Sequence, residues 1–414
     1  MLNLNILKSE RFRRLSKEGF WVILGQAMAV VGSLVGVRLL TELLDPASYG
    51  ELALGMTVAT LVNQTLLGPL SSGVTRFYAP AVEQGDLGGY LSAVRRLVVS
   101  ATGIVMFIIL VAVAGLFVTG RTEWIAIAIV ALIFATLSGY NSILSGIQNA
   151  ARQRSVVALH QGIEPWGRFL AAAGLMILMG ATSTVAMIGY ALGVILVIGS
   201  QYVFFRKIAT KNIIEADKEI NWREQMLKYS WPFASWGIFT WAQLVSDRWA
   251  LGLFATMQDV GMYAVLFQLG YYPMSMATGI AMQFLAPIFY QRAGDASDSL
   301  RNDNVSNLSR RLTWMALGVT AVAFLVVFLF HTQIFRIFVN KEYAAISYLL
   351  PWMVLAGGVF AASQTLALNL MSQMKTQTMT VAKIITALAG VLFNFVGAYW
   401  YGSTGIVMAG VFFS

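Results

Sequence analysis

Two apolar stretches of the chain resemble each other at an offset of about 210 residues. Trp21 and Trp231 open the two copies, and Arg38 and Arg248 fall at matching depth inside them. A repeat of this length indicates two structurally equivalent halves, so any fold for this chain has to accommodate a duplication.

Two further pairs of motifs extend the repeat. Turns at 45–50 and 258–261 end the opening segments, and Arg95-Arg96-Leu97 and Arg310-Arg311-Leu312 follow at an offset of about 215 residues. A duplicated membrane bundle with a buried arginine in each half is typical of a transporter.

The composition of the chain is that of a polytopic membrane protein. Hydrophobic residues make up 58% and charged residues only 11% of the 414 residues, whereas soluble domains carry about 25% charged residues. The mean hydropathy of +0.70 supports the same conclusion. The sequence contains no cysteine, which excludes disulfides, thiolate metal sites and cysteine nucleophiles.

Apolar runs of about 20 residues are the signal of membrane helices. The first run contains Gly32-x-x-x-Gly36, a spacing of small residues that lets helix backbones approach closely. A twelfth run begins near Thr404 and reaches Ser414. We expect it to be a truncated span, the alternative being a short last helix. The eleven preceding runs lie at 19–44, 50–78, 96–118, 122–148, 156–180, 183–205, 229–255, 260–289, 311–332, 343–371 and 377–400.

Lys and Arg are distributed unequally between the two sides of these spans. With the N-terminus in the cytoplasm, 20 of the 28 Lys and Arg residues fall on the cytoplasmic side and three on the outer side. The positive-inside rule therefore predicts a multi-pass protein of the cytoplasmic (inner) membrane with a cytoplasmic N-terminus. The net charge of +9 then reflects topology and attraction to anionic lipid, and no nucleic-acid partner is expected.

Six spans separate the two copies of the repeat, so both halves enter the membrane in the same orientation. Such repeats are related by an axis along the membrane normal, with the substrate site between them near the midplane. We therefore predict an all-α polytopic membrane protein of two six-helix lobes related by a pseudo-twofold axis. The predicted divisions are a cytoplasmic juxtamembrane segment (1–18), an N-terminal lobe (19–206), a cytoplasmic inter-lobe linker (207–228) and a C-terminal lobe (229–414).

The polar connectors are too short to fold around cores of their own, the longest lying at about 206–228 and 291–310. P-loop, His-Glu-x-x-His and Asp-x-Asp patterns are absent from the sequence. We therefore expect no enzyme, no catalytic residue, no metal site and no cofactor, and an ion gradient or the substrate gradient as the energy source.

Ionisable side chains inside the predicted spans are the candidate functional residues. A charge at the centre of a membrane helix costs about 2.5–3.5 kcal/mol and so usually faces water or a partner. Basic residues exceed acidic ones among them, which favours an anionic substrate. The candidates are Arg38, Arg76, Arg168, Arg248, Lys383, Glu164, Asp247 and the titratable neighbour His160.

Arg38 and Arg248 occupy equivalent levels in the two halves. The repeat symmetry favours a pair of cations that face each other across a central cavity and bind substrate there. The alternative is that each snorkels to the outer headgroups or pairs with a nearby acid, Glu42 for Arg38 and Asp247 for Arg248. Arg168 and Lys383 are further candidates for this cationic, substrate-binding cavity.

His160, Glu164 and Arg168 fall at i, i+4 and i+8 on one stripe of the fifth span. Pro165 leaves one carbonyl of this span without its helical donor, which favours a local break. A broken helix beside titratable groups is a candidate ion site, so Glu164, Asp247 and His160 are the ion-coupling candidates. The alternative is a structural Glu164–Arg168 pair, because Glu four residues before Arg is a favourable ion-pair order.

Aromatic and basic residues mark the inner ends of two equivalent spans. Arg76 and Tyr78 end the second span, and Tyr290 lies at the matching end of the eighth. We predict that these three residues form a cytoplasmic gate or portal. The alternative for Arg76 is snorkelling to the cytoplasmic headgroups.

The segment Leu44-Asp45-Pro46-Ala47-Ser48-Tyr49-Gly50, which follows a span carrying Arg38 and precedes Leu52-Ala53-Leu54, resembles the signature of polysaccharide-type flippases. The later Leu67-Gly68 and Arg76-Phe77-Tyr78 fit the same pattern. These flippases are the Wzx-like members of the multidrug/oligosaccharidyl-lipid/polysaccharide (MOP) exporter superfamily. The resemblance extends over nearly the whole chain.

The resemblance implies two six-helix lobes that form a V around a central cationic cavity, with the positions of Arg38 and Arg248 implicated in it. It also implies a flippase that moves polyprenyl-diphosphate-linked oligosaccharide, an O-antigen or exopolysaccharide repeat unit, across the cytoplasmic membrane by alternating access. We expect coupling to a proton or sodium, and association with membrane lipid and with glycan polymerase and export machinery.

Two other functions compete with this interpretation. A multidrug or small-molecule cation antiporter of the same superfamily would need a cavity dominated by acids, whereas basic residues predominate here. A membrane-embedded glycan polymerase or acyltransferase usually places its catalytic groups in a large outer loop, whereas all the outer loops predicted here are short.

Overall fold

The computed structural model describes residues 4–209, 220–294 and 298–414. Throughout these ranges the regular secondary structure is helical. Within the described residues, seven helices are long and apolar enough to cross a membrane. In one of them, α11 (Ser299–Phe338), only 6% of the most apolar 18-residue stretch is buried within the protein. Exposed apolar helix surface of this kind suits contact with lipid, in agreement with the predicted helical membrane fold.

The chain forms two compact units, each of which takes in a short segment from the other half of the sequence. The first unit comprises Met1–Leu43 and Gly55–Trp241, and the second comprises Leu44–Leu54 and Ala242–Ser414. Helix α8 (Trp222–Phe254) therefore contributes to both. Residues 210–219 of the predicted linker lie outside the described residues, and α8 already begins within the predicted linker.

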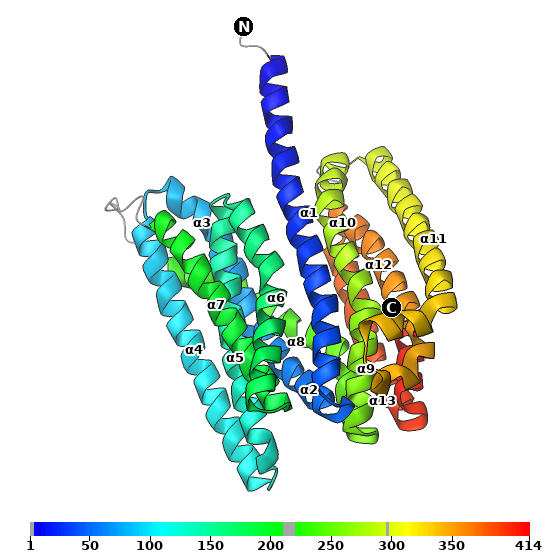
Figure 1. The fold of residues 1–414 in the computed structure, drawn as a ribbon. Coiled ribbons are helices and arrows are strands. Elements are labelled where there is room, and N and C mark those ends of the chain that lie inside the picture. The colour runs from blue at the N-terminus through cyan, green and yellow to red at the C-terminus, as the bar shows by residue number, and fades with distance from the viewer. Residues whose placement is uncertain (1–3, 210–219, 295–297) are drawn as a thin grey trace. The chain divides into compact units, whose positions relative to one another are not determined.

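The first unit is built from long helices packed side by side (Figure 1). Among them are α1 (Leu4–Leu43), α4 (Leu87–Val118), α5 (Ile125–Ala150), α6 (Arg154–Met179) and α7 (Ser183–Ala209). Helix α1 packs on α6, α6 on α7, and α7 on α5, which also contacts α4. Helix α1 runs without a break from the predicted juxtamembrane segment into the first span.

Glycines let α1 pack closely against bulky rings of α6. A Cβ on Gly36 would lie 2.1 Å from the Phe169 ring, and one on Gly32 would lie 2.7 Å from the Trp166 indole. Trp166 Nε1 also donates a hydrogen bond of 3.0 Å to the carbonyl oxygen of Met28. The Gly32-x-x-x-Gly36 motif therefore lies at a helix–helix contact, as its spacing predicts.

The second predicted span contains a π turn. Helix α2 (Pro46–Val62) passes into the π-helical residues Asn63–Leu67 and then into α3 (Gly68–Glu83). A Cβ on Gly237 of α8 would lie 1.9 Å from the carbonyl oxygen of Gln64. Helix α8 therefore crosses directly over the π turn, and glycine is required at the crossing because any side chain would meet backbone.

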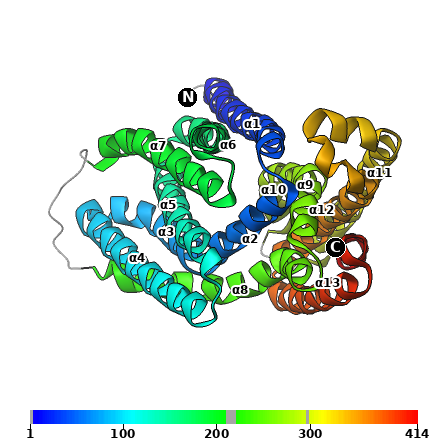
Figure 2. The ribbon, with the colours of Figure 1, turned by 60° about the horizontal axis from the view of Figure 1, so that its bottom comes forward.

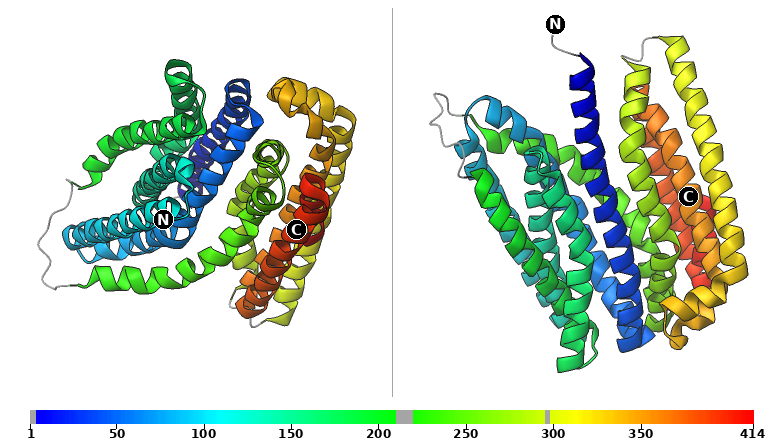
Figure 3. Two further views of the ribbon diagram at one scale, coloured as in Figure 1. Left: turned by 90° about the horizontal axis from the view of Figure 1, so that it is seen from below. Right: turned by 45° about the horizontal axis from the view of Figure 1, so that its top comes forward.

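The second unit is arranged around α12 (Figures 2 and 3). Its elements are α9 (Met257–Leu269), α10 (Tyr271–Ala293), α11, a 3-10 segment (Lys341–Leu349), α12 (Leu350–Ser372) and α13 (Thr376–Phe413). Helix α12 packs against α10, α11 and α13. Two consecutive helices, α9 and α10, cover the predicted span at 260–289 and meet at Gly270.

Gly402 bends α13 so that the part of the helix after this residue folds back on the part before it. Its φ of 54° and ψ of −135° lie outside helical space, in a region that glycine adopts readily. A Cβ on Gly397 would lie 2.7 Å from the carbonyl oxygen of Gly405, and one on Gly405 would lie 2.1 Å from that of Gly397. The segment after Gly402 therefore packs against the segment before it.

The two turns of the internal repeat pack against each other within the second unit. A Cβ on Gly50 would lie 2.1 Å from the carbonyl oxygen of Met257, and one on Gly261 would lie 1.8 Å from that of Pro46. Each glycine thus faces the first turn of the helix that carries the other. Reciprocal contacts of this kind arise where two equivalent elements meet around a twofold axis.

Side-chain caps explain why α2 and α9 both start at this contact. Asp45 Oδ1 accepts a 2.7 Å hydrogen bond from the Ser48 backbone N–H, and Thr256 Oγ1 accepts one of 3.2 Å from the Asp259 backbone N–H. Both caps satisfy backbone donors that the first helical turn leaves without a partner. The Tyr343 hydroxyl donates a 2.8 Å bond to the carbonyl just before Asp45, which fixes the chain leading into α2.

Candidate functional site

Arg248 is held from two sides by residues of α8 and α9. Its Nη1 donates 3.3 Å hydrogen bonds to Asp247 Oδ1 and to the carbonyl oxygen of Leu244. Its guanidinium carbon lies 4.5 Å from the centroid of the Phe267 ring and 5.9 Å from that of Tyr263. Cation–ring attraction at these distances grows where water is excluded, and the Arg248 side chain is only 12% exposed.

Asp247 is a buried carboxylate, and both of its oxygens accept hydrogen bonds. Its Oδ1 accepts from the Arg248 backbone N–H at 2.6 Å as well as from the guanidinium, and its Oδ2 accepts from the Tyr263 hydroxyl at 2.7 Å. A buried carboxylate is tolerated when it is paired and hydrogen-bonded in this way. The arrangement fixes the orientation of Arg248.

The guanidinium of Arg248 keeps donors for a ligand. Within the described part of the chain, both of its side-chain hydrogen bonds leave from Nη1. Arginine carries five N–H donors, so those on Nη2 and Nε remain for an anion that reaches the guanidinium. Donors in this fork geometry match the paired oxygens of a phosphate or carboxylate.

Arg168 has the same kind of surroundings in the first unit. Its Nη1 lies 3.5 Å from Glu164 Oε1. Its guanidinium carbon lies 4.9 Å from the centroid of the Phe169 ring and 5.0 Å from that of Tyr190 on α7. Each unit therefore holds one largely buried arginine that is paired with an acid and contacts one Phe and one Tyr ring.

His160 does not join this group. Its Nδ1 lies 2.7 Å from the carbonyl oxygen of Val156, and its Nε2 lies 3.1 Å from the Ser200 hydroxyl on α7. The ring is buried and meets Phe204 edge-on at 5.7 Å. The predicted stripe thus brings Glu164 to Arg168 but places His160 against a different part of α7, and its ion-coupling role stays a prediction.

Arg38 forms an ion pair with Glu42, one turn further along α1. The two side chains are 39% and 42% exposed, so the pair itself contributes only about 0–1 kcal/mol. Ion pairing with Glu42 and with Asp247 was predicted as an alternative to cavity lining by Arg38 and Arg248. Both ion pairs are present. Binding of substrate by these two arginines stays a prediction.

The remaining predicted residues are distributed over α3, α10 and α13. Arg76 is exposed on α3, whereas Tyr78 is buried and packs edge-on against Tyr90 at a centroid distance of 5.9 Å. Tyr290 is exposed on α10, and Lys383 is half-buried on α13. The gate and cavity roles of these residues stay predictions.

The aromatic residues that contact Arg168 and Arg248 were not among the predicted site residues. Tyr263 and Phe267 are four residues apart on α9, a spacing that sets both rings on one helix face, so a signal for this pair was present. Phe169 directly follows Arg168 in the sequence. Tyr190 reaches Arg168 only because α6 packs on α7, which the sequence does not reveal.

We call Arg168 and Arg248 caged arginines, because each is paired with an acid and contacts a Phe and a Tyr ring. Long apolar helices that carry such buried cations define a multi-pass membrane protein. The chain belongs to a family described as "Polysaccharide biosynthesis protein" (Polysacc_synt), whose sequence profile matches residues 15–292. No curated protein sequence matches the chain.

Solved structures with a similar fold are transporters of the MOP superfamily. A multidrug resistance MATE family transporter in an inward-facing conformation has a TM-score of 0.71 at 13% identity, with 95% of each chain covered. Lipid II flippase MurJ in an inward closed conformation has a TM-score of 0.70 at 14% identity, covering 96% of this chain and 84% of MurJ. A MOP superfamily transporter from Pyrococcus furiosus has a TM-score of 0.60 at 14% identity, covering 95% and 91%. These similarities confirm the predicted MOP transporter fold.

Proposed function

We propose that the chain is a flippase that moves a polyprenyl-diphosphate-linked oligosaccharide across the cytoplasmic membrane by alternating access, with its N-terminus in the cytoplasm. Membership of the polysaccharide biosynthesis family supports a glycan substrate, and the fold shared with a lipid II flippase supports a lipid-linked one. The excess of Lys and Arg on one side of the predicted spans supports the orientation.

The observation that carries the proposal is the arrangement around Arg248. Asp247 and the rings of Tyr263 and Phe267 hold the guanidinium in place, so little side-chain entropy is lost when a ligand binds. The donors left on Nη2 and Nε suit the paired oxygens of a diphosphate. In this proposal Arg168 supplies a second caged cation, and Arg38 and Lys383 add positive charge.

The pairing of the intramembrane acids argues against a multidrug or cation antiporter, which has the same fold. A site for an organic cation needs a carboxylate that is not already neutralised. Glu164 and Asp247, the two acids among the candidate residues, are each ion-paired with arginine. An anionic substrate is therefore favoured.

We propose Glu164 as the group that couples transport to a proton or sodium. Asp247 is 7% exposed and has both oxygens engaged by three hydrogen bonds. Glu164 is 20% exposed and is held by one ion pair, at 3.5 Å. A carboxylate held by a single contact keeps acceptor sites for a proton or sodium, whereas both oxygens of Asp247 are occupied, so Glu164 is the better candidate.

Transport by the purified chain in vesicles tests the proposal. A polyprenyl diphosphate carrying a fluorescent sugar is placed in both leaflets, and an impermeant quencher added outside destroys the outer-leaflet signal. Flipping should make the protected fluorescence decay faster than in protein-free vesicles. A parallel assay follows efflux of a fluorescent organic cation. Cation efflux without lipid flipping would establish the antiporter instead.

A further inference from the structure

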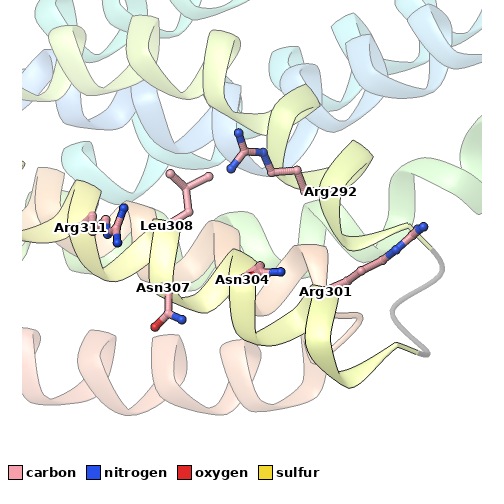
Figure 4. Close-up of a pocket in the computed structure, with 6 residues that line it drawn as sticks. All are labelled: Arg292, Arg301, Asn304, Asn307, Leu308 and Arg311. Carbon is pink, nitrogen blue, oxygen red and sulfur yellow. The ribbon is translucent and has the colours of Figure 1, made fainter.

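A cationic pocket of about 440 Å³ lies between α10 and α11 of the second unit (Figure 4). Arg292 lines it from α10, and the other lining residues come from α11. None of them belongs to the Arg248 group or to the other residues predicted above. The α11 residues are Arg301, Asn304, Asn307, Leu308 and Arg311.

The lining combines three guanidinium groups with two amides, and none of the described residues that line it is an acid. Among the described residues, no ion pair joins Arg292 or Arg311 to a carboxylate. Arg301 lies 3.6 Å from Asp298, but their side chains are 60% and 47% exposed. An ion pair this exposed is weak, so Arg301 can exchange it for a ligand at little cost. Clustered arginines with amide donors suit phosphate oxygens.

The packing of α10 and α11 holds the pocket in shape. Arg301, Asn304, Leu308 and Arg311 follow one another at intervals of three, four and three residues, so they share one face of α11. Leu308 also packs on a buried apolar cluster beneath the pocket. The cluster consists of Phe289, Ala293, Val305 and Leu368. This packing fixes the position of the part of α11 that carries the guanidinium groups.

The position of the pocket along α11 places it at the level of lipid headgroups. Between Arg301 and Arg311 the exposed side chains of α11 are polar, and a run of exposed apolar side chains begins with Trp314 and Met315. Exposed tryptophan is enriched at the membrane–water interface. A ligand held by Arg311 therefore has the apolar, lipid-facing surface of α11 within one helical turn.

We infer that this pocket binds the phosphate or diphosphate group of a lipid headgroup, with the lipid tail along the exposed apolar face of α11. In the orientation proposed above, the lipid lies in the cytoplasmic leaflet. The inference rests on the proposed function only for its favoured occupant, the polyprenyl diphosphate that the flippase would receive from that leaflet. An anionic phospholipid is the other source of the same chemistry.

Lipid binding to the purified chain tests the inference, with Arg311→Ala as the variant and Arg310→Ala as the matched control. Arg310 is exposed on the same helix and does not line the pocket, so both variants lose one charge at neighbouring positions. Native mass spectrometry measures retention of a polyprenyl diphosphate, of phosphatidylglycerol and of diacylglycerol, which has no phosphate. Thermal unfolding in detergent verifies that both variants are folded.

Arg311→Ala should weaken retention of the polyprenyl diphosphate about tenfold relative to Arg310→Ala, with diacylglycerol unaffected. An equal loss for phosphatidylglycerol would support a pocket for anionic lipid in general, and a loss confined to the diphosphate would support substrate capture. Equal retention of both phosphate-bearing lipids by the two variants would overturn the inference. Because binding is measured without transport, failure of the flippase proposal would leave this result unchanged.

Discussion

Replacing Gly261 by alanine is expected to destabilise the second unit, because the contact between the two repeat turns leaves no room for a side chain. The new Cβ would lie 1.8 Å from the carbonyl oxygen of Pro46 and 2.9 Å from the backbone nitrogen of Gly50. Both atoms are backbone of α2, so only a shift of a whole helix relieves the clash. Gly50→Ala should act in the same way through the Met257 carbonyl, 2.1 Å away.

Two opposing terms set the magnitude. A glycine-to-alanine change inside a helix gains roughly 0.5–1 kcal/mol in backbone entropy and helix propensity. Overpacking of a rigid contact costs about 1–3 kcal/mol. The clash at Gly261 is with backbone at 1.8 Å, which favours the upper end of that range, so the net loss is about 1–2 kcal/mol. Nothing lies within 4 Å of a Cβ on Gly279 of α10, so Gly279→Ala shows the favourable term alone and is the matched control.

Thermal unfolding in detergent, followed by the fluorescence of the 11 tryptophans, measures the effect. Gly261→Ala and Gly50→Ala should unfold at lower temperatures than the unmodified chain, and Gly279→Ala at the same temperature or higher. The double variant at Gly50 and Gly261 should lose less than the sum of the single losses, because one shift of α2 against α9 accommodates both methyl groups. A Gly261→Ala chain as stable as Gly279→Ala would refute the contact between the repeat turns.

Two further predictions concern the acids beside the caged arginines. Glu164→Gln replaces the carboxylate beside Arg168 with an amide, which cannot take up a proton or sodium in its place. Lipid flipping should therefore lose its response to an imposed proton or sodium gradient. An unchanged response would count against Glu164 as the coupling group. Tyr263→Phe takes a 2.7 Å donor from the buried Asp247 and should cost about 1–2 kcal/mol of stability, seen as a lower unfolding temperature. An unfolding temperature equal to that of the unmodified chain would show that Asp247 does not need this donor.

Much of the fold follows from local features of the sequence. Apolar run length predicts the helices because a membrane leaves the backbone few other ways to satisfy its hydrogen bonds. The small-residue spacing at Gly32 and Gly36 predicts close helix packing because it depends on residue size alone. The repeat identifies the turns around Gly50 and Gly261 as equivalent, although it does not show that they touch.

Features that depend on packing between helices could not be predicted from the sequence. The π turn at Asn63–Leu67 lies where α8 crosses at Gly237, a contact between segments far apart in the chain. His160 is eight residues before Arg168, which rotates it by about 80° around an α-helix. Because of that rotation, His160 contacts Ser200 while Arg168 contacts Tyr190. The spacing alone therefore grouped His160 with Glu164 and Arg168, although its contacts are different.

The flipping rate of Arg248→Ala tests the central claim most directly, with Arg248→Lys and Arg121→Ala measured beside it. Arg121 is exposed between α4 and α5, so its loss changes the net charge without touching a caged arginine. We expect Arg248→Ala to lower the rate by about tenfold or more, Arg248→Lys to restore part of it because lysine keeps the charge but not the fork, and Arg121→Ala to have no effect. An Arg248→Ala chain that flips lipid at the unmodified rate would contradict diphosphate binding by the caged arginine.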